Sequence, residues 1–444
     1  MTPLAHGIGG ASDLPIPFTY AVVGAAWALT FSFAILAFAW REPRLDPHSP
    51  GRALPAGLRA CCDSPAVRAV LGGLGVAVLA LALAIGVFGD RAQARNPLPG
   101  MVYIFLWVGV MVASLLVGPV WKIVSPVRAL HRLGCRMAGR DPARGLLPYP
   151  GGWGMRPAAL GLFSFVWLEL ASPEPGSVTA VTAWLAGYVV IGLAGLIVFG
   201  TVWAERGDPL EVYSSLMARL SPLSRRESGE LALRWPLNNL AGAPASAGMV
   251  AVTATLLGST AFDSLSASAG WRDLTLDLAG NSTPSRTLFQ TAGLLAVIGI
   301  VAAAFTLAAR ATGGVSGAER AMLPIRLAHS LVPVIAGYVV AHYLSFLVEK
   351  GQATLILLAD PLGLGWSLPL LGNLEVHYVL SAHPAVLGSI KVAAVLAGHI
   401  LGVTAAHDRC LRLLPPRHRL TGQLALMLVM VGYTFTGLYL LFDA

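Results

Sequence analysis

The sequence predicts an all-α protein that crosses a membrane about ten times. Three observations predict this fold class: the composition, the number of long apolar blocks, and the alternation of basic and non-basic loops. Of the 444 residues, 56% are hydrophobic and only 12% are charged, whereas a soluble domain carries about 25% charged residues. These few charges could not cover the surface of a water-soluble globule, so that class is excluded.

Ten apolar blocks are long enough to cross about 30 Å of hydrocarbon as helices. They lie at 17–40, 69–89, 101–118, 156–172, 179–203, 247–265, 288–309, 323–348, 384–408 and 419–441. Their apolar residues are continuous and do not alternate with polar ones, which favours helices over a β-barrel. We therefore expect a single polytopic membrane domain over residues 1–444.

The basic residues of the connecting segments predict the orientation. Alternate segments, beginning with the one after the first block, hold 24 Lys and Arg residues, and the others hold five. Because basic loops stay in the cytoplasm, this division places both termini outside it. All four cysteines fall in the basic segments, where thiols stay reduced. The expected location is a membrane with one cytoplasmic side, and the lipid bilayer is the main expected partner. The net charge of +8 follows from these loops and does not indicate nucleic-acid binding.

Two cytoplasmic segments resemble amphipathic helices that lie on the membrane surface. The first begins at Ser125, and Pro126 suits the first helical turn. It carries basic residues at four-residue spacing, at Arg128, Arg132 and Arg136. The second begins at Asp208 in a capping-box-like start and ends before Pro222. Both helices could recognise lipid or a partner, or could only anchor the bundle.

A candidate active centre gathers at the predicted outer face. Asp263 ends the sixth block and His342 lies in the outer part of the eighth, while His377 and His383 follow in the next loop and His6 precedes the first block. Imidazoles and carboxylates together suit a divalent metal such as zinc, which activates water for hydrolysis. Asp263 and His342 are the preferred catalytic residues because rigid helices hold ligands better than loops do. The alternative is a hydrated rim of interfacial residues.

Two further interpretations use other intramembrane residues. His329 and His399 fall at similar depth on neighbouring spans and could ligate haem, as could His342 and His383 nearer the outer surface. Polar packing between helices is the simpler explanation of such histidines. A permease is the other alternative, in which Lys391, His399 and the polar face of the sixth block line a path.

Several motifs that would indicate other functions do not occur. The sequence has no Walker A loop and no GxGxxG after a strand, and it lacks the GxSxG of α/β-hydrolases. ATP-driven transport by this chain alone and α/β-hydrolase chemistry are therefore disfavoured.

Several phrases of the sequence resemble a known family when they are taken together. They are AHGIGGASDLPIPF at 5–18, GPVWKIVSPVRALHRL at 118–133, YSSLMARLSPL at 213–223, GSTAFDSL at 258–265 and LAHSLVPVIAGYVVAHYLSFL at 327–347. This combination resembles the fenitrothion hydrolase-like family of bacterial multi-pass membrane proteins. The resemblance implies hydrolysis of an apolar small-molecule substrate, an organophosphorus triester, by a multi-pass protein of the bacterial plasma membrane. Family members usually carry a basic residue where this chain has Ala11.

Overall fold

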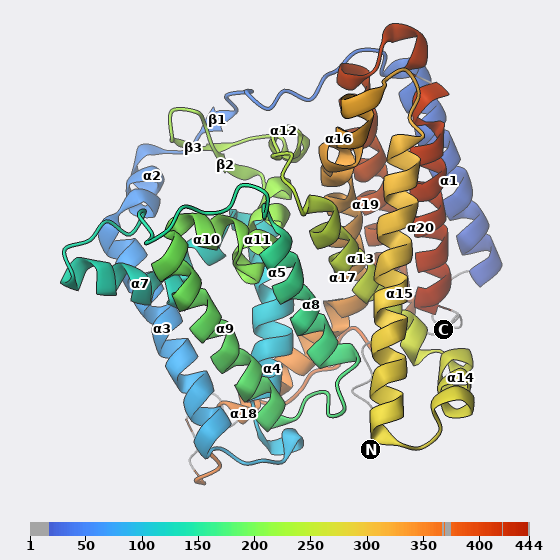
Figure 1. Cartoon of the computed structure of the whole chain (residues 1–444). Coiled ribbons are helices and arrows are strands. Elements are labelled where there is room, and N and C mark those ends of the chain that lie inside the picture. The colour runs from blue at the N-terminus through green and yellow to red at the C-terminus, as the bar shows by residue number, and fades with distance from the viewer. Residues whose placement is uncertain (1–16, 366–367, 369–373, 420, 443–444) are drawn as a thin grey trace.

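The computed structural model is a bundle of long helices, most of which run up and down the view of Figure 1. The structure describes residues 17–365, 368, 374–419 and 421–442. Within these residues, seven helices are long and apolar enough to cross a membrane. They are Pro65–Phe88 (α3), Leu98–Val117 (α4, η3 and α5), Val178–Phe199 (α9), Thr283–Arg310 (α15), Gly317–Leu357 (α16 to α18), Pro384–Leu413 (α19) and Thr421–Phe442 (η8 and α20). The prediction of an all-α membrane protein is confirmed at this level.

The three other predicted blocks also form helices, namely α1 (Phe18–Ala39), α8 (Arg156–Leu170) and α13 (Met249–Ala267). The shortest is α8, with 15 residues, and α1 has 22 residues, none of them charged. In Figure 1, α1 begins and α20 ends toward the same end of the bundle, which also carries α14 (Ala269–Ala279). We call this the α14 end, and the opposite end the α12 end, after α12 (Pro236–Ala241).

Short helices and one small sheet complete the fold. The helices are α2 (Ala56–Asp63), η2 (Gln93–Arg95), α6 (Trp121–Val124), α7 (Pro126–Met137), α10 (Thr201–Arg206), α11 (Pro209–Met217), η4 (Ala218–Leu220) and η7 (Pro416–His418). At the α12 end, β1 (Arg52–Ala53), β3 (Leu231–Leu233) and β2 (Leu223–Arg225) pair antiparallel in that order. The sheet ties the segment after α1 to the hairpin after α11.

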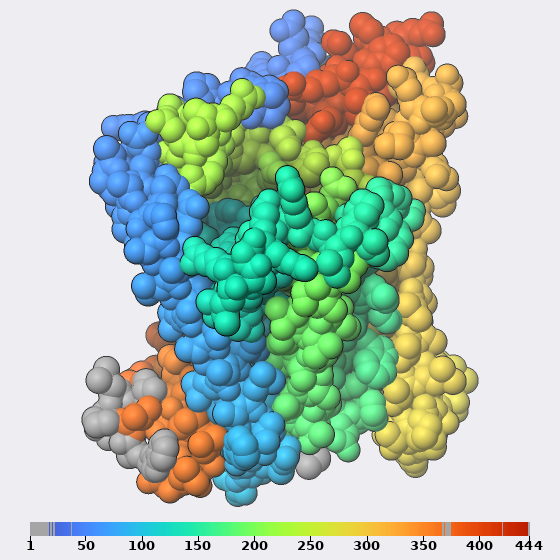
Figure 2. All heavy atoms as spheres, turned by 60° about the vertical axis from the view of Figure 1, so that its left-hand side comes forward, coloured from blue at the N-terminus to red at the C-terminus, as the bar shows by residue number. Residues whose placement is uncertain are grey.

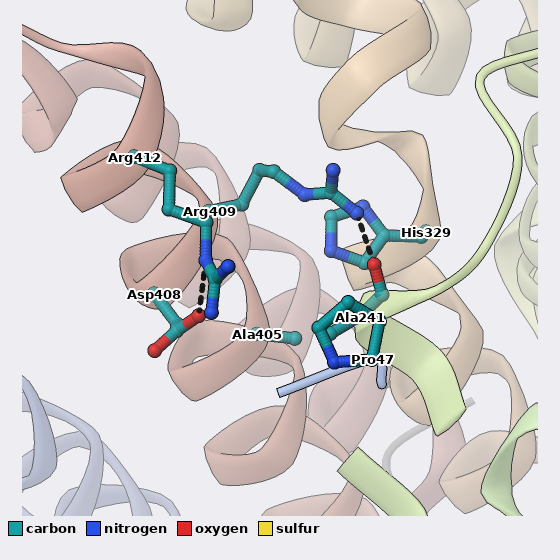
Figure 3. A pocket seen from close by; sticks show the side chains of 7 residues that line it. All are labelled: Pro47, Ala241, His329, Ala405, Asp408, Arg409 and Arg412. Atoms are coloured by element: carbon teal, nitrogen blue, oxygen red, sulfur yellow. Dashed lines mark hydrogen bonds and ion pairs between the residues drawn. The ribbon is translucent and has the colours of Figure 1, made fainter. Parts of the chain in front are cut away.

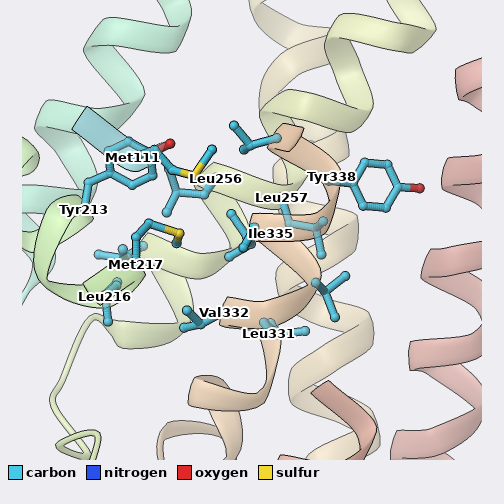
Figure 4. Packing of buried hydrophobic residues seen from close by; sticks show 14 of the residues in the cluster. Met111, Tyr213, Leu216, Met217, Leu256, Leu257, Leu331, Val332, Ile335 and Tyr338 are labelled. Atoms are coloured by element: carbon cyan, nitrogen blue, oxygen red, sulfur yellow. The ribbon is translucent and has the colours of Figure 1, made fainter. Parts of the chain in front are cut away.

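α13 lies in the middle of the bundle, in contact with α8, α15, α17 (Leu331–Ser345) and α20. Thirteen of its 19 residues are buried, including several Thr and Ser. Figure 4 shows α13 and α17 packed through Leu256, Leu257, Val332 and Ile335. Because a helix buried on all sides has no lipid-facing stripe, it can carry polar side chains that other helices then meet.

Glycines let α17 and α19 pack with their backbones in contact. A Cβ atom built at Gly398 would lie 2.5 Å from the carbonyl oxygen of Pro333 and 3.1 Å from the Cα atom of Gly337. A Cβ atom at Gly402 would lie 2.7 Å from the carbonyl oxygen of Ser330. Small residues at such a crossing are how membrane helices approach most closely.

The first helix is held by the last two. α1 packs against α19 and α20, and the end of α1 is fixed by residues near the end of α19. The carboxylate of Asp408 accepts hydrogen bonds from the Trp40 indole (3.1 Å), the Arg44 amide (2.6 Å) and the Leu45 amide (3.1 Å). Large apolar side chains of α1 remain exposed on its outer side, among them Trp27 and Phe31. These suit a helix that faces lipid.

The first predicted surface helix forms as α7. Ser125 caps it by accepting from the Arg128 amide, and Pro126 stands at the first helical position. Figure 2 shows the segment around α7 lying across α3 and α9. Leu133 and Met137 stay exposed, while Arg128 points inward and is buried.

The second predicted surface helix forms as α11, but it does not lie on a surface. The helix is buried nearly all round, and Tyr213, Leu216 and Met217 pack into the main core (Figure 4). Its Glu211 pairs through both carboxylate oxygens with Arg128 of α7, and both side chains are buried. The prediction of an interfacial amphipathic helix is therefore wrong for α11, because neighbouring helices cover the face that this prediction exposes to water.

Asp208, the N-cap residue of α11, has a raised pKa. Asp208 accepts from the amides of Leu210 and Glu211 and from the hydroxyl of Tyr188, each at 2.9 Å. Burial raises the pKa of the Asp208 carboxyl to about 6 despite these hydrogen bonds.

Candidate functional site

Asp263, His342 and Tyr343 meet inside the bundle and form what we call the acid–base cluster. The His342 Nε2 atom lies 2.8 Å from the Asp263 Oδ2 atom, and the Tyr343 hydroxyl donates to the same oxygen at 3.1 Å. The three residues are 5%, 1% and 3% exposed. A carboxylate that binds one ring nitrogen fixes the orientation and tautomer of the imidazole, as it does in hydrolytic triads.

The helices explain why these side chains converge. Asp263 lies in the last turns of α13, and α17 passes beside it. His342 and Tyr343 are adjacent on α17, so their side chains leave the helix about 100° apart. Both still reach Asp263, and their rings meet edge to face with centroids 4.7 Å apart.

A second carboxylate, Glu169 at the end of α8, lies close to this cluster. It is 8% exposed and lies within electrostatic range of the hydroxyls of Tyr103, Tyr213 and Tyr343. The rings of Trp107 stack on those of Phe165 (4.5 Å) and Tyr213 (4.6 Å) and close this side. The interior of the bundle therefore holds two carboxylates, one imidazole and three phenols behind an aromatic wall.

Two π-helical segments lie next to these buried polar groups, since one carries Tyr103 and the other follows Tyr343. One is η3 (Met101–Gly109), and the other is η6 (Phe346–Lys350), which begins three residues after Tyr343. The two segments pack against each other. π-helices are rare, and within α-helices they occur frequently at functional sites. Their presence beside the same buried charges marks this region as a candidate site.

The other predicted metal ligands do not join Asp263 and His342. His377 and His383 are exposed in the loop before α19, and the Nδ1 atom of His383 binds the carbonyl oxygen of Val379. His6 lies outside the described residues. Among the described residues, no group of three or more His, Cys, Asp or Glu side chains could hold a metal ion. Asp263 and His342 could supply two ligands, so the zinc prediction stays a prediction.

Glu349 lies in η6, which continues the helix that carries His342, and it has a structural role. Its carboxylate accepts from the Leu380 amide (3.1 Å), the Ser381 amide (2.8 Å) and the Ser381 hydroxyl (2.6 Å). These bonds fasten the loop that carries His377 and His383 to η6.

The two predicted haem ligands, His329 and His399, bind different partners. The Nδ1 atom of His329 binds the carbonyl oxygen of Arg326 at 3.0 Å, and the Nδ1 atom of His399 binds the hydroxyl of Thr434 on α20. Between them α17 and α19 touch through the glycines at 398 and 402. A haem does not fit between helices in backbone contact, so this structure offers no bis-histidine site for His329 and His399. His342 and His383 do not form one either, since His342 is buried against Asp263 and His383 is exposed.

Lys391 and His399 are both buried in α19, each 1% exposed. They lie eight residues apart, so they occupy one face of that helix about 12 Å apart. Lys391 has an interaction partner and is not an isolated charge.

Two cavities lie away from the acid–base cluster. A cavity of about 500 Å³ at the α14 end is lined by residues that include Leu265, Ser268 and Tyr439. Leu265 follows Asp263 by two residues and therefore points to nearly the opposite side of α13. A smaller cavity of about 50 Å³ lies at the α12 end and is shown in Figure 3.

No family model, curated protein or solved structure matches the chain. The roles of the site therefore depend on its chemistry and on the motifs of the sequence. Sequence reasoning selected Asp263 and His342 but missed Tyr343, Tyr213 and the π-helices. The only available signal was the pair of adjacent aromatic polar residues at 342–343 inside an apolar block.

Proposed function

We propose that the chain is a membrane-embedded hydrolase of neutral organophosphorus triesters, with the acid–base cluster as its catalytic centre. The observation that carries the proposal is the hydrogen bond of 2.8 Å between His342 and Asp263 within a buried, carboxylate-rich region. Titratable groups that are buried and specifically paired are concentrated at functional sites. The resemblance to the fenitrothion hydrolase-like family supplies the substrate class.

In this proposal His342 is the general base and Asp263 orients it. A water molecule attacks the phosphorus atom while one of its protons passes to the imidazole. The bond from phosphorus to the leaving oxygen breaks, and the leaving group departs with the electron pair. Neutral apolar triesters partition into the bilayer, so they reach a site inside the bundle more easily than charged substrates do.

The test compares two buried histidines. Membranes that contain the wild-type chain, His342→Gln or His399→Gln are assayed for nitrophenol release from a nitrophenyl phosphotriester. Removing a general base lowers the rate by about 10²–10⁴-fold, so we expect that loss for His342→Gln and near wild-type turnover for the matched His399→Gln. Turnover by folded His342→Gln equal to that of the wild type would refute the role of the cluster.

A metal requirement is tested in the same preparations. If zinc is bound as predicted, Asp263→Ala and His342→Ala lose both the metal and the activity while folded protein remains in the membrane. Activity that survives complete removal of metal shows that the His342–Asp263 pair acts without it.

A proton-coupled permease is the second candidate, favoured by the burial of Lys391 and His399 on one face of α19. The wild-type protein in liposomes would then dissipate an imposed pH gradient when a substrate is present. Lys391→Met and His399→Gln would both abolish this transport. Loss of transport in His399→Gln supports the permease, whereas the hydrolase predicts that this variant keeps its turnover.

We further propose ten spans with both termini outside the cytoplasm of a bacterial cell, so that the α12 end is cytoplasmic. The support is the division of basic residues between the connecting segments. The basic segments include α7 and the small sheet, which lie at or toward the α12 end. Single cysteines at Arg136 and Arg226 should resist an impermeant thiol reagent in intact cells, and a cysteine at Glu375 should react. A cytoplasmic Glu375 would contradict this topology.

A further inference from the structure

We propose that the small cavity at the α12 end is a binding site for a phosphate-type oxoanion. We call it the arginine pocket; its polar lining comes from His329, Asp408, Arg409 and Arg412 (Figure 3). It lies at the end of the bundle opposite to α14 and does not depend on the hydrolytic proposal.

The size of the pocket suits one small anion. Its volume of about 50 Å³ compares with about 10–15 Å³ of such space for one water molecule. The pocket therefore has room for a few waters or for one tetrahedral oxoanion. Arg412, whose side chain is 38% exposed, forms the rim.

Positive charge exceeds negative charge around the pocket. Arg409 and Arg412 line it, and Arg326 lies within electrostatic range of Arg409. Asp408 is the carboxylate of the lining, and it is already engaged. It holds the end of α1 and lies 3.3 Å from the Nε atom of Arg412. An anion would balance the remaining charge of the arginines.

Arg409 has donors to offer. Within the described part of the chain its guanidinium donates one hydrogen bond, from Nη2 to the carbonyl oxygen of Ala241 at 2.5 Å. A guanidinium carries five N–H donors in a planar fork that matches an oxoanion. His329 forms the neighbouring wall and is held by its bond to the Arg326 carbonyl. The donors that face the pocket therefore come from the arginines of α19, because the N–H group of His329 already binds the Arg326 carbonyl.

Binding would join parts of the chain that are far apart in sequence. The pocket lies where α19, the turn around His329, α12 and the segment after α1 meet. A ligand that binds only the folded protein stabilises it in proportion to the logarithm of its concentration over Kd. We therefore expect the anion to stabilise the α12 end of the full chain.

The experiment uses the full chain in detergent. Binding of radiolabelled inorganic phosphate is measured by equilibrium dialysis, and Tm is followed in phosphate against chloride at equal ionic strength. The variants are Arg409→Gln, Arg409→Lys and the matched control Arg417→Gln, since Arg417 lies at the same end but outside the pocket. We expect saturable binding and a rise in Tm for the wild type and Arg417→Gln. Arg409→Gln should bind about tenfold or more weakly, because a hydrogen bond to a charged group is lost.

A second arm identifies the source of the phosphate group. Phosphatidate and phosphatidylcholine are added in mixed micelles, and displacement of labelled phosphate is measured. Displacement by phosphatidate alone indicates a lipid headgroup, and no displacement by either indicates a free anion. If the wild type does not bind labelled phosphate, or if folded Arg409→Gln binds it as tightly as the wild type, the proposal is overturned.

Discussion

Replacing Gly398 by alanine should force α17 and α19 apart. The new Cβ atom would lie 2.5 Å from the carbonyl oxygen of Pro333, while ordinary contact begins at 3.4 Å, so the helices must separate by about 0.9 Å. All three nearest atoms belong to the backbone of Pro333 and Gly337, and no side-chain rotamer can relieve the overlap. Overpacking of this kind costs about 1–3 kcal/mol.

The matched control is Gly432→Ala in α20, where a Cβ atom meets nothing within 4 Å. Both variants gain the same restriction of the unfolded chain, about 0.4–1 kcal/mol, so their difference isolates the clash. Unfolding of the purified proteins by SDS titration, followed by tryptophan fluorescence, measures the two free energies. Equal stability of Gly398→Ala and Gly432→Ala would show that the helices do not meet as described.

Three further changes test other parts of the bundle. Because the pKa of Asp208 is raised, the folded state holds a proton that the unfolded state releases, so this group stabilises the fold fully below about pH 4 and the stabilisation is lost as pH rises through about 6. Asp208→Asn should flatten that part of the curve of Tm against pH. An unchanged slope would contradict the assignment. Glu211→Gln should destabilise the protein by about 3–5 kcal/mol because Arg128 stays buried beside a neutral partner. The double variant Arg128→Met with Glu211→Leu should lose much less stability. Equal losses of unfolding free energy in denaturation experiments would contradict a desolvated ion pair. Glu349→Gln should speed hydrogen exchange at the Leu380 and Ser381 amides, which lose a charged acceptor, and unchanged protection would show that the loop is held otherwise.

The positions of the helices follow from the sequence more closely than their surroundings do. Each of the ten apolar blocks is helical, and two predicted starts, at Ser125 and Asp208, are observed as caps. These features depend on residues close together in the chain. The burial of the Glu211 charge in α11 depends instead on its partner Arg128, which is 83 residues away. No local pattern reports such a distant partner.

Some residues of the candidate site can likewise be predicted from the sequence, and others cannot. Charged groups near the ends of spans are costly and therefore informative, which favours Asp263 and His342, and the structure brings these two residues together. Their catalytic role stays a prediction. Tyr343 and the aromatic wall could not be selected, since an aromatic residue in an apolar block is most often packing. Their position in the sequence predicts that His377 and His383 join the site, but both side chains are exposed in the loop before α19.

The attachment of α1 has a consequence for how the chain is made. Trp40 and Asp408 are 368 residues apart, and synthesis at about 5–20 residues per second separates them by roughly 20–70 s. During that interval α1 exists without α19 and α20, the two long helices that it packs against. Its buried side, with Ala25 and Leu29, must be covered by lipid or by an insertion factor until the last helices emerge. The first segment to be made is therefore among the last to find its native neighbours, and a nascent chain stopped before residue 384 leaves it unattached.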